Sequence, residues 1–116
     1  MNWKALQIAS ATGMLFVATP ALAAPTYLTC TFDTGAVPIK VTLDEQAASA
    51  GVFVPSNGNS FNFRATFTAD QVLFQNDDGI KYEIDRVTLR IVRSIPRYRI
   101  VDRGLCRVEK APKRAI

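Results

Sequence analysis

The chain contains no histidine, and its only tryptophan and both methionines lie within the first 14 residues. Without histidine, neither a Ser-His-Asp nor a Cys-His catalytic arrangement can form, and the commonest zinc ligand is missing. Carboxylate-only catalysis stays open, although most acidic residues stand at turns and strand ends. Asp77-Asp78-Gly79 offers too few oxygen ligands for a calcium loop. We therefore predict a protein that is not an enzyme and that uses no metal and no cofactor.

Cysteine is also scarce, since the chain has only Cys30 and Cys106. Their separation is unlike the Cys-x-x-Cys spacing of redox-active dithiols. A pair of cysteines in an exported chain usually forms a structural bridge. We predict a Cys30–Cys106 disulfide between the beginning and the end of the domain.

Long apolar runs are absent except near the N-terminus, where Ala5–Ala18 is mainly apolar and follows Lys4. Pro20 then precedes Ala21-Leu22-Ala23, which has small residues where signal peptidase requires them. The run is shorter than the roughly 20 apolar residues that span a membrane. We predict a signal peptide over residues 1–23, cleaved before Ala24, and a periplasmic or secreted protein without a transmembrane segment.

Helical patterns are scarce as well. From Ala24 onward, apolar residues recur at every second position in short runs bounded by turn residues, as in Pro38–Leu43. We predict an all-β domain over residues 24–109, an antiparallel meander of about seven to nine short strands that forms a small barrel or sandwich. Asp44–Ala50 is expected to be a loop or a single turn capped by Asp44, and residues 110–116 a basic, disordered tail.

Three phenylalanines alternate along Ser60–Thr68, at Phe61, Phe63 and Phe67. Such a row can line a core or form a stacking platform for single-stranded nucleic acid. Because only Arg64 interleaves the rings, we expect a core face.

The clearest alternation lies in Lys81–Val92 and continues in Tyr98–Cys106. The apolar positions are even before Asp85-Arg86 and odd after it. A strand keeps one parity on its buried face, so we expect a bulge or a tight bend at Asp85-Arg86.

A hairpin register can be argued for the strands on either side of Arg93–Pro96. If Leu89 faces Ile100, the apolar sides of Val87–Val92 and Tyr98–Asp102 coincide. The same register sets arginines opposite one another on the outer face, which is unfavourable unless acids intervene or an anionic partner binds. The candidate binding residues are therefore Arg86 with Arg103 and Arg90 with Arg99.

Charge is unevenly distributed along the chain. Residues 24–78 hold two basic and six acidic residues, whereas residues 79–116 hold eleven basic and four acidic ones. The two parts either interleave and form internal ion pairs, for which Glu83 and Asp85 are candidates, or leave a basic face for a partner. Arginine outnumbers lysine in the basic part, which suits planar pairing with carboxylate or phosphate in both cases.

Several short motifs resemble a loose class of small exported single-disulfide β-proteins of Gram-negative bacteria, which have no known activity. The motifs are Tyr27–Cys30, Ile39–Glu45, Phe67–Phe74, Tyr82–Leu89 and Gly104–Cys106. Members of that class often carry an Ile-Asp-Arg-x-Thr-Gly step, and Leu89 stands here in place of the glycine, which predicts a continuing strand rather than a turn. The Tyr-x-x-Cys start also resembles periplasmic inhibitors of c-type lysozyme, but their Ser-Gly-x-x-Tyr loop is absent, so no inhibitory residue is transferred.

These observations lead to two main functional hypotheses; a third, carriage of a small apolar ligand inside a barrel, needs a cavity, and the many phenylalanines are expected to fill the interior instead. The first is a non-enzymatic binding module whose arginine-rich face takes an anionic envelope component or an acidic protein; export argues against nucleic acid. The alternative is a periplasmic inhibitor of a cell-wall hydrolase, with a projecting loop at Pro55–Ser60.

Overall fold

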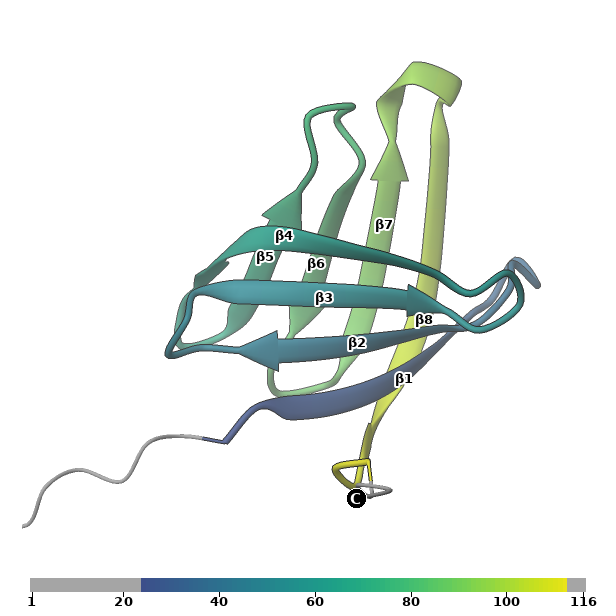
Figure 1. The fold of residues 1–116 in the computed structure, drawn as a ribbon. Helices are drawn as coiled ribbons and strands as arrows, with labels where there is room; N and C mark the ends of the chain where they lie inside the picture. The colour runs from purple at the N-terminus through teal and green to yellow at the C-terminus, as the bar shows by residue number, and fades with distance from the viewer. Residues whose placement is uncertain (1–23, 113–116) are drawn as a thin grey trace, which may run out of the picture.

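Eight strands and one short 3-10 helix make up residues 24–112, the part of the chain that the computed structural model describes (Figure 1). The predicted signal peptide and residues 113–116 of the predicted tail lie outside this part. No helix within it is long and apolar enough to cross a membrane. The elements are β1 (Thr26–Phe32), β2 (Ile39–Asp44), β3 (Ser49–Val54), β4 (Asn59–Phe67), β5 (Gln71–Gln75), β6 (Lys81–Asp85), β7 (Arg90–Ile95), η2 (Pro96–Tyr98) and β8 (Ile100–Glu109).

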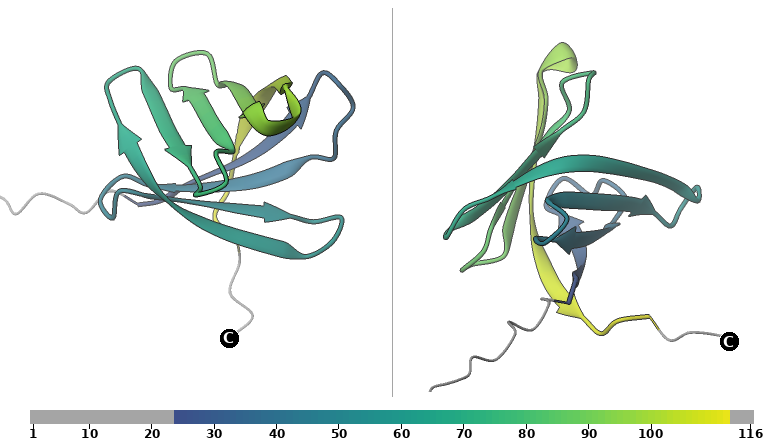
Figure 2. Two further views of the ribbon diagram at one scale, coloured as in Figure 1. Left: turned by 90° about the horizontal axis from the view of Figure 1, so that it is seen from above. Right: turned by 60° about the vertical axis from the view of Figure 1, so that its left-hand side comes forward.

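Each strand pairs antiparallel with the next one in the chain, and β8 returns to pair with β1, which closes the sheet into a barrel. In Figures 1 and 2, strands β2–β4 run across strands β6–β8, so the two halves of the wall face each other. The predicted all-β meander is confirmed, and the architecture is a barrel rather than a sandwich.

The barrel interior is filled by side chains from alternate positions, as the sequence pattern predicted. The adjacent strands β4, β5 and β6 contribute a cluster of the Phe63, Phe74 and Tyr82 rings, with centroids 4.8–5.6 Å apart. Phe61 was expected on the same face but is 47% exposed, because it lies near the end of the barrel. The buried apolar residues are Leu28, Cys30, Phe32, Ile39, Val41, Leu43, Ala50, Val52, Phe63, Ala65, Val72, Phe74, Tyr82, Ile84, Ile91 and Cys106.

The turn that Asp44 was predicted to cap is confirmed, and a second turn with polar residues connects β5 to β6. Asp44 Oδ1 accepts a hydrogen bond from the backbone N–H of Ala47 at 3.1 Å, which closes the single turn between β2 and β3. Between β5 and β6, Gly79 takes a φ of +84° and Asn76 Oδ1 accepts from the N–H of Ile80. Polar turn residues therefore place β2 against β3 and β5 against β6.

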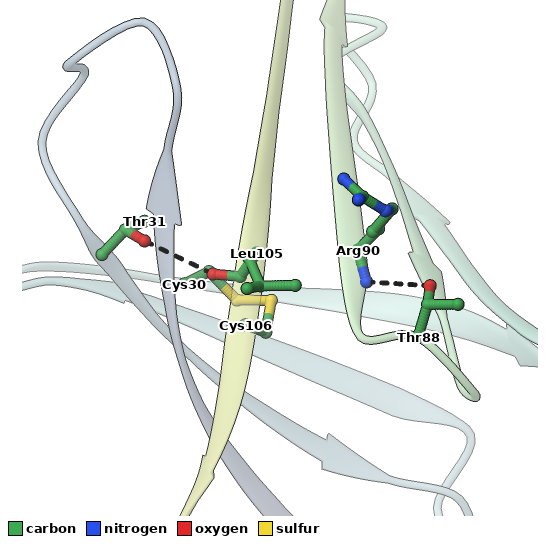
Figure 3. Close-up of a disulfide and its surroundings, with 6 residues drawn as sticks. All are labelled: Cys30, Thr31, Thr88, Arg90, Leu105 and Cys106. Atoms are coloured by element: carbon green, nitrogen blue, oxygen red, sulfur yellow. Dashed lines mark hydrogen bonds between the residues drawn. A yellow bond between two sulfur atoms is a disulfide. The ribbon is translucent and has the colours of Figure 1, made fainter.

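The predicted disulfide joins Cys30 on β1 to Cys106 on β8 (Figure 3). The two residues lie directly opposite each other in the β1–β8 register, and both are buried. The bond links residues 76 positions apart in the sequence. It therefore ties together the two strands whose pairing closes the barrel.

Gly104 lies beside this disulfide, opposite Phe32 on β1 and Ile91 on β7. A Cβ atom at this position would stand 2.0 Å from the carbonyl oxygen of Thr31 and 2.9 Å from the Cα of Phe32. Backbone atoms of a paired strand cannot move aside as a flexible side chain does. Only glycine permits β1 and β8 to approach this closely.

Replacing Gly104 with alanine is expected to lower the free energy of unfolding by about 2 kcal/mol, because the added methyl overpacks the β1–β8 pairing. Gly51→Ala is the matched control, since Gly51 also lies inside a strand but a Cβ there would meet no atom closer than 3.4 Å. Equilibrium urea unfolding measures both variants. Equal stabilities would contradict the close approach at Gly104.

The predicted bend at Asp85-Arg86 is confirmed as the start of the turn between β6 and β7. Asp85 Oδ1 accepts hydrogen bonds from the backbone N–H groups of Thr88 and Val87, both at 2.8 Å, and these bonds lower the pKa of Asp85. The expectation that the strand continues through Leu89 is wrong, because β7 begins at Arg90 and Leu89 has a φ of +63°. The Leu89 side chain packs against the core, and this contact accompanies a backbone conformation that favours glycine.

The predicted register of the β7–β8 hairpin is wrong. Strand β7 continues to Ile95 and η2 forms the turn, so Arg90 faces Leu105 and Arg93 faces Asp102, and the described strands set no two arginines opposite each other. The true register differs from the predicted one by an even number of residues. An even shift leaves each strand's apolar side facing the interior, so alternation does not distinguish the two registers.

Candidate binding surface

The four predicted binding arginines do not all lie on one surface. Arg86 lies at one end of the barrel, where its side chain contacts neighbouring turns. Its guanidinium forms an ion pair with Glu45, with 2.8 Å between Nη2 and Oε1. It also donates to the carbonyl oxygen of Thr68 and lies 5.8 Å from the centre of the Phe67 ring. These contacts join the turn after β2, the turn after β4 and the turn after β6. Arg86 therefore does not belong to the candidate surface, which corrects its assignment from the sequence.

Arg93 points into the barrel, and sequence reasoning missed it. Its Nε and Nη2 donate to Oδ2 of Asp102 at 3.1 and 2.5 Å, and its guanidinium lies 4.4 Å from the centre of the Phe32 ring. The Thr34 hydroxyl donates to Oδ1 of Asp102 at 3.0 Å. Asp102 is 6% exposed, and the hydrogen bond from Arg93 holds its pKa below the ordinary value. The sequence did contain a signal for this pair, because Arg93 and Asp102 both occupy positions that the apolar alternation assigns to the core.

Strand β8 carries arginines and apolar side chains in alternation on its outer side. The residues between them are buried, so these side chains point away from the barrel. The members of this β8 outer row are Val101, Arg103, Leu105 and Arg107. Val101 and Leu105 are 46% and 53% exposed. Two apolar side chains are thus exposed to solvent between arginine side chains.

Arg90 on β7 adds a charge beside this row. It faces Leu105 across the β7–β8 pairing (Figure 3), which places it diagonally from Arg103 and Arg107. Diagonal neighbours in an antiparallel pair are about 7–8 Å apart, within reach of long side chains. No ion pair within 4.0 Å joins Arg90 or Arg103 to an acidic residue of the described chain.

Arg99 lies at the tip of the β7–β8 hairpin, together with Arg97 and Tyr98. The chain turns through η2, and Arg99 follows with a φ of +54° and its N–H bonded to the carbonyl oxygen of Pro96 at 3.0 Å. Both arginines are exposed, and Tyr98 is 65% exposed. In Figures 1 and 2 this tip extends farther from the barrel than the turn between β5 and β6. The hairpin therefore presents two cations and one aromatic ring at its end.

Few acidic groups lie near these arginines. The sequence has no aspartate or glutamate between Arg86 and Val101. Asp33 is a close neighbour of Arg103, because the backbone N–H of Asp33 donates to the carbonyl oxygen of Arg103 at 2.7 Å. The Asp33 carboxylate nevertheless lies beyond the 4.0 Å ion-pair distance from the Arg103 guanidinium. The side of the barrel formed by β7 and β8 keeps a positive excess.

Two further acids near this side are already paired. Arg107 donates to Glu109 at 2.6 Å, which lowers the pKa of Glu109, and Lys81 lies 3.5 Å from Glu83. Arg107 is thus partly neutralised, at the end of the β8 outer row.

Comparison with family models, with curated proteins and with solved structures found no match. The resemblances drawn from short motifs therefore stay predictions, and the surface is argued from its own residues. Within residues 24–112, no three histidine, cysteine, aspartate or glutamate side chains are grouped as a metal site would require.

The segment Pro55–Ser60, predicted as the projecting loop of an inhibitor, forms a tight turn between β3 and β4. The N–H of Gly58 bonds to the carbonyl oxygen of Val54 at 2.8 Å, and Asn57 Oδ1 accepts from the N–H of Asn59. Asn59 and Ser60 already belong to β4. This turn contributes no charge to the basic side.

A cavity of about 290 Å³ lies at the same end of the barrel as Arg86 and is lined by side chains such as Leu43, Phe67 and Leu89. The two charged residues that line it, Glu45 and Arg86, pair with each other. The cavity therefore offers no free charge to orient a ligand.

Proposed function

We propose that the protein is a non-enzymatic binding module of the periplasm or the extracellular space, and that the basic side of the β7–β8 hairpin binds an anionic partner. The observation that supports this proposal is a division among the arginines. Those with a carboxylate partner are Arg86, Arg93 and Arg107. On β7, β8 and the turn between them, the arginines that are exposed and form no ion pair with the rest of residues 24–112 are Arg90, Arg97, Arg99 and Arg103; Arg64, which is also exposed and unpaired, lies apart from them on β4.

The chemistry of these side chains indicates the class of partner. A guanidinium presents planar donors that match carboxylate or phosphate groups. Several such groups on one side of a small barrel raise the local potential and attract an anion. An anionic envelope component or an acidic protein meets both conditions.

Two other properties of the chain agree with this role. The Cys30–Cys106 disulfide is compatible with an oxidising compartment, as the predicted signal peptide requires. The lack of histidine removes the commonest general base and nucleophile activator, which favours binding over catalysis.

Binding to an envelope fraction of a Gram-negative bacterium is expected to depend on Arg90 and Arg103. The protein is exported under its own N-terminal segment, so that the predicted signal peptide is removed and the disulfide forms, and it is then sedimented with the fraction at low and high salt. Arg90→Gln combined with Arg103→Gln is expected to weaken binding about tenfold, because two exposed ion contacts are lost. Salt is expected to release the unaltered protein, since between about 0.01 and 1 M the Debye length falls from about 30 to about 3 Å.

The matched control is Lys40→Gln combined with Arg64→Gln, which removes the same charge from β2 and β4. Both control residues are exposed and have no carboxylate within 4.0 Å in the described chain. Their replacement is expected to leave binding nearly unchanged. Equal losses in the two double variants, or binding that ignores salt, would rule out a specific surface on β7 and β8.

A further inference from the structure

We propose that the anionic partner is the surface of a phospholipid bilayer, which the protein contacts through the β8 outer row and the hairpin tip. This inference rests on the proposed function and names its partner. It follows from three features of the same surface: exposed apolar groups between the arginines, an excess of positive charge and a hairpin tip that projects from the barrel.

The first feature is the apolar component. Val101 and Leu105 alternate with arginines along β8, and Tyr98 stands between two arginines at the tip. All three side chains are about half exposed or more. A hydrated soluble polyanion makes use of the cations alone. A bilayer interface offers phosphates to the guanidinium groups and an acyl boundary to the apolar groups, and tyrosine is enriched at that depth.

The second feature is the sign of the charge. Arg90, Arg97, Arg99 and Arg103 are exposed and form no ion pair within residues 24–112, and the sequence has no acidic residue between Arg86 and Val101. The one acid that faces the hairpin interior, Asp102, is held by Arg93. Each basic group close to an anionic leaflet strengthens membrane binding roughly fivefold at moderate salt.

The third feature is the shape. Five cavities of the barrel are all lined by residues outside the span from Arg90 to Arg107. The tip is the far end of a hairpin that extends from the wall, so it can meet a flat surface (Figure 2). At about 3.3 Å per residue, the row from Val101 to Arg107 is roughly 20 Å long, enough to lie along the headgroup region. A strand face with a projecting hairpin tip suits a flat, deformable partner better than a side chain that needs a pocket.

Vesicle sedimentation tests the inference with disulfide-bonded protein that has been exported under its own N-terminal segment, so that the predicted signal peptide is removed and its apolar run does not bind the lipid. The probes are vesicles of phosphatidylglycerol mixed equally with phosphatidylcholine, vesicles of phosphatidylcholine alone, and soluble polyphosphate. We expect binding to the mixed vesicles and little binding to the neutral ones. Arg99→Gln combined with Arg103→Gln is expected to weaken vesicle binding about thirtyfold, because two charges near the leaflet are removed.

An uncharged variant separates a lipid surface from other polyanions. Val101→Thr combined with Leu105→Thr keeps the charge and the β-propensity but removes apolar groups, so we expect vesicle binding to fall about tenfold and polyphosphate binding to stay unchanged. Phe53→Thr is the control, since Phe53 is a 39% exposed apolar residue on β3. Unaltered far-UV circular dichroism checks that each variant is folded.

A reporter at the tip gives an independent measurement. In a Trp3→Phe chain, Tyr98→Trp places the only tryptophan at the end of the hairpin. Its emission is expected to shift to the blue on mixed vesicles, whereas Phe53→Trp in the same background shows no shift. Equal shifts at both positions would contradict contact through the hairpin.

The outcomes separate this inference from the proposed function. Equal binding to neutral vesicles, or equal vesicle binding by the Val101→Thr/Leu105→Thr and Phe53→Thr variants, overturns the lipid surface as partner. A second outcome is that the protein does not bind vesicles but still binds the envelope fraction through Arg90 and Arg103. If protease treatment of the fraction then abolishes this binding, the partner is an acidic protein, and only the lipid inference fails. Absence of binding to both overturns both proposals.

Discussion

Removing the Cys30–Cys106 disulfide is expected to lower the free energy of unfolding by about 4 kcal/mol, because the bond closes a loop of 76 residues in the unfolded chain. A small domain has a total stability of about 5–15 kcal/mol, so the reduced protein should approach the unfolding threshold. The variant is Cys30→Ala combined with Cys106→Ala. Its equilibrium urea unfolding is compared with that of the oxidised protein.

Reduction of the unaltered protein supplies the control for the side-chain change. It breaks the same bond without removing either sulfur atom from the barrel interior, where Cys30 and Cys106 are 0% and 3% exposed. We expect reduction to account for most of the loss seen in the double variant. Coincident unfolding curves for the oxidised and reduced protein would show that β1–β8 pairing holds without the bond.

Replacing Asp102 with asparagine is expected to lower the free energy of unfolding by about 3 kcal/mol, since it leaves the inward Arg93 guanidinium without a counter-charge. The side chains of Arg93 and Asp102 are only 16% and 9% exposed, so water compensates little of this loss. Arg93→Met combined with Asp102→Leu is the matched control, because replacing a whole buried ion pair with apolar residues is often neutral. If the single variant loses less than about 1 kcal/mol, or the double variant is no more stable than the single one, the pair has no such role.

The same pair predicts a pH dependence with a definite sign. The pKa of Asp102 is lowered in the folded state by the hydrogen bond from Arg93, so its carboxylate binds a proton less readily when folded than when unfolded. Its contribution is therefore complete well above the unfolded pKa of about 3.9 and is lost as the pH falls through the folded value. The stability difference between the protein and the Asp102→Asn variant should be constant near neutral pH and shrink on acidification below about pH 5. A difference that grows on acidification would contradict this assignment.

The outer arginines behave differently from the inward pair because of the medium around them. Arg93 lies among Phe32, Asp102 and the core, where an unpaired charge is strongly unfavourable. Arg90 and Arg103 stand in water, where the missing partner affects folding little and an external anion can take its place. This contrast explains why we expect Asp102 to control stability and Arg103 to control binding.

Local pattern was sufficient to predict the strands and the core. The alternation in Pro38–Leu43 predicted a strand with one apolar face, and the structure confirms that Ile39, Val41 and Leu43 on that face are buried. Burial on one face with period two is a property of a strand by itself, and turn residues such as Asp44 act within a few positions. The disulfide followed from the count of cysteines. The basic half of the chain was equally visible in the sequence, because it consists of consecutive elements.

The tertiary structure decided the register and the roles of the arginines. Two hairpin registers that differ by an even number of residues bury the same faces of both strands. Alternation therefore could not distinguish the observed register, in which Arg93 faces Asp102, from the predicted one, in which Leu89 faces Ile100. Arg86 finds Glu45, a partner 41 residues away, only because closure of the barrel brings their turns together. Ion pairs depend on such distant positions and carry no periodic signal along the chain. For that reason the sequence determined an all-β fold with one disulfide, and only the closed barrel determined which arginines pair inside the protein and which remain exposed on its outer side.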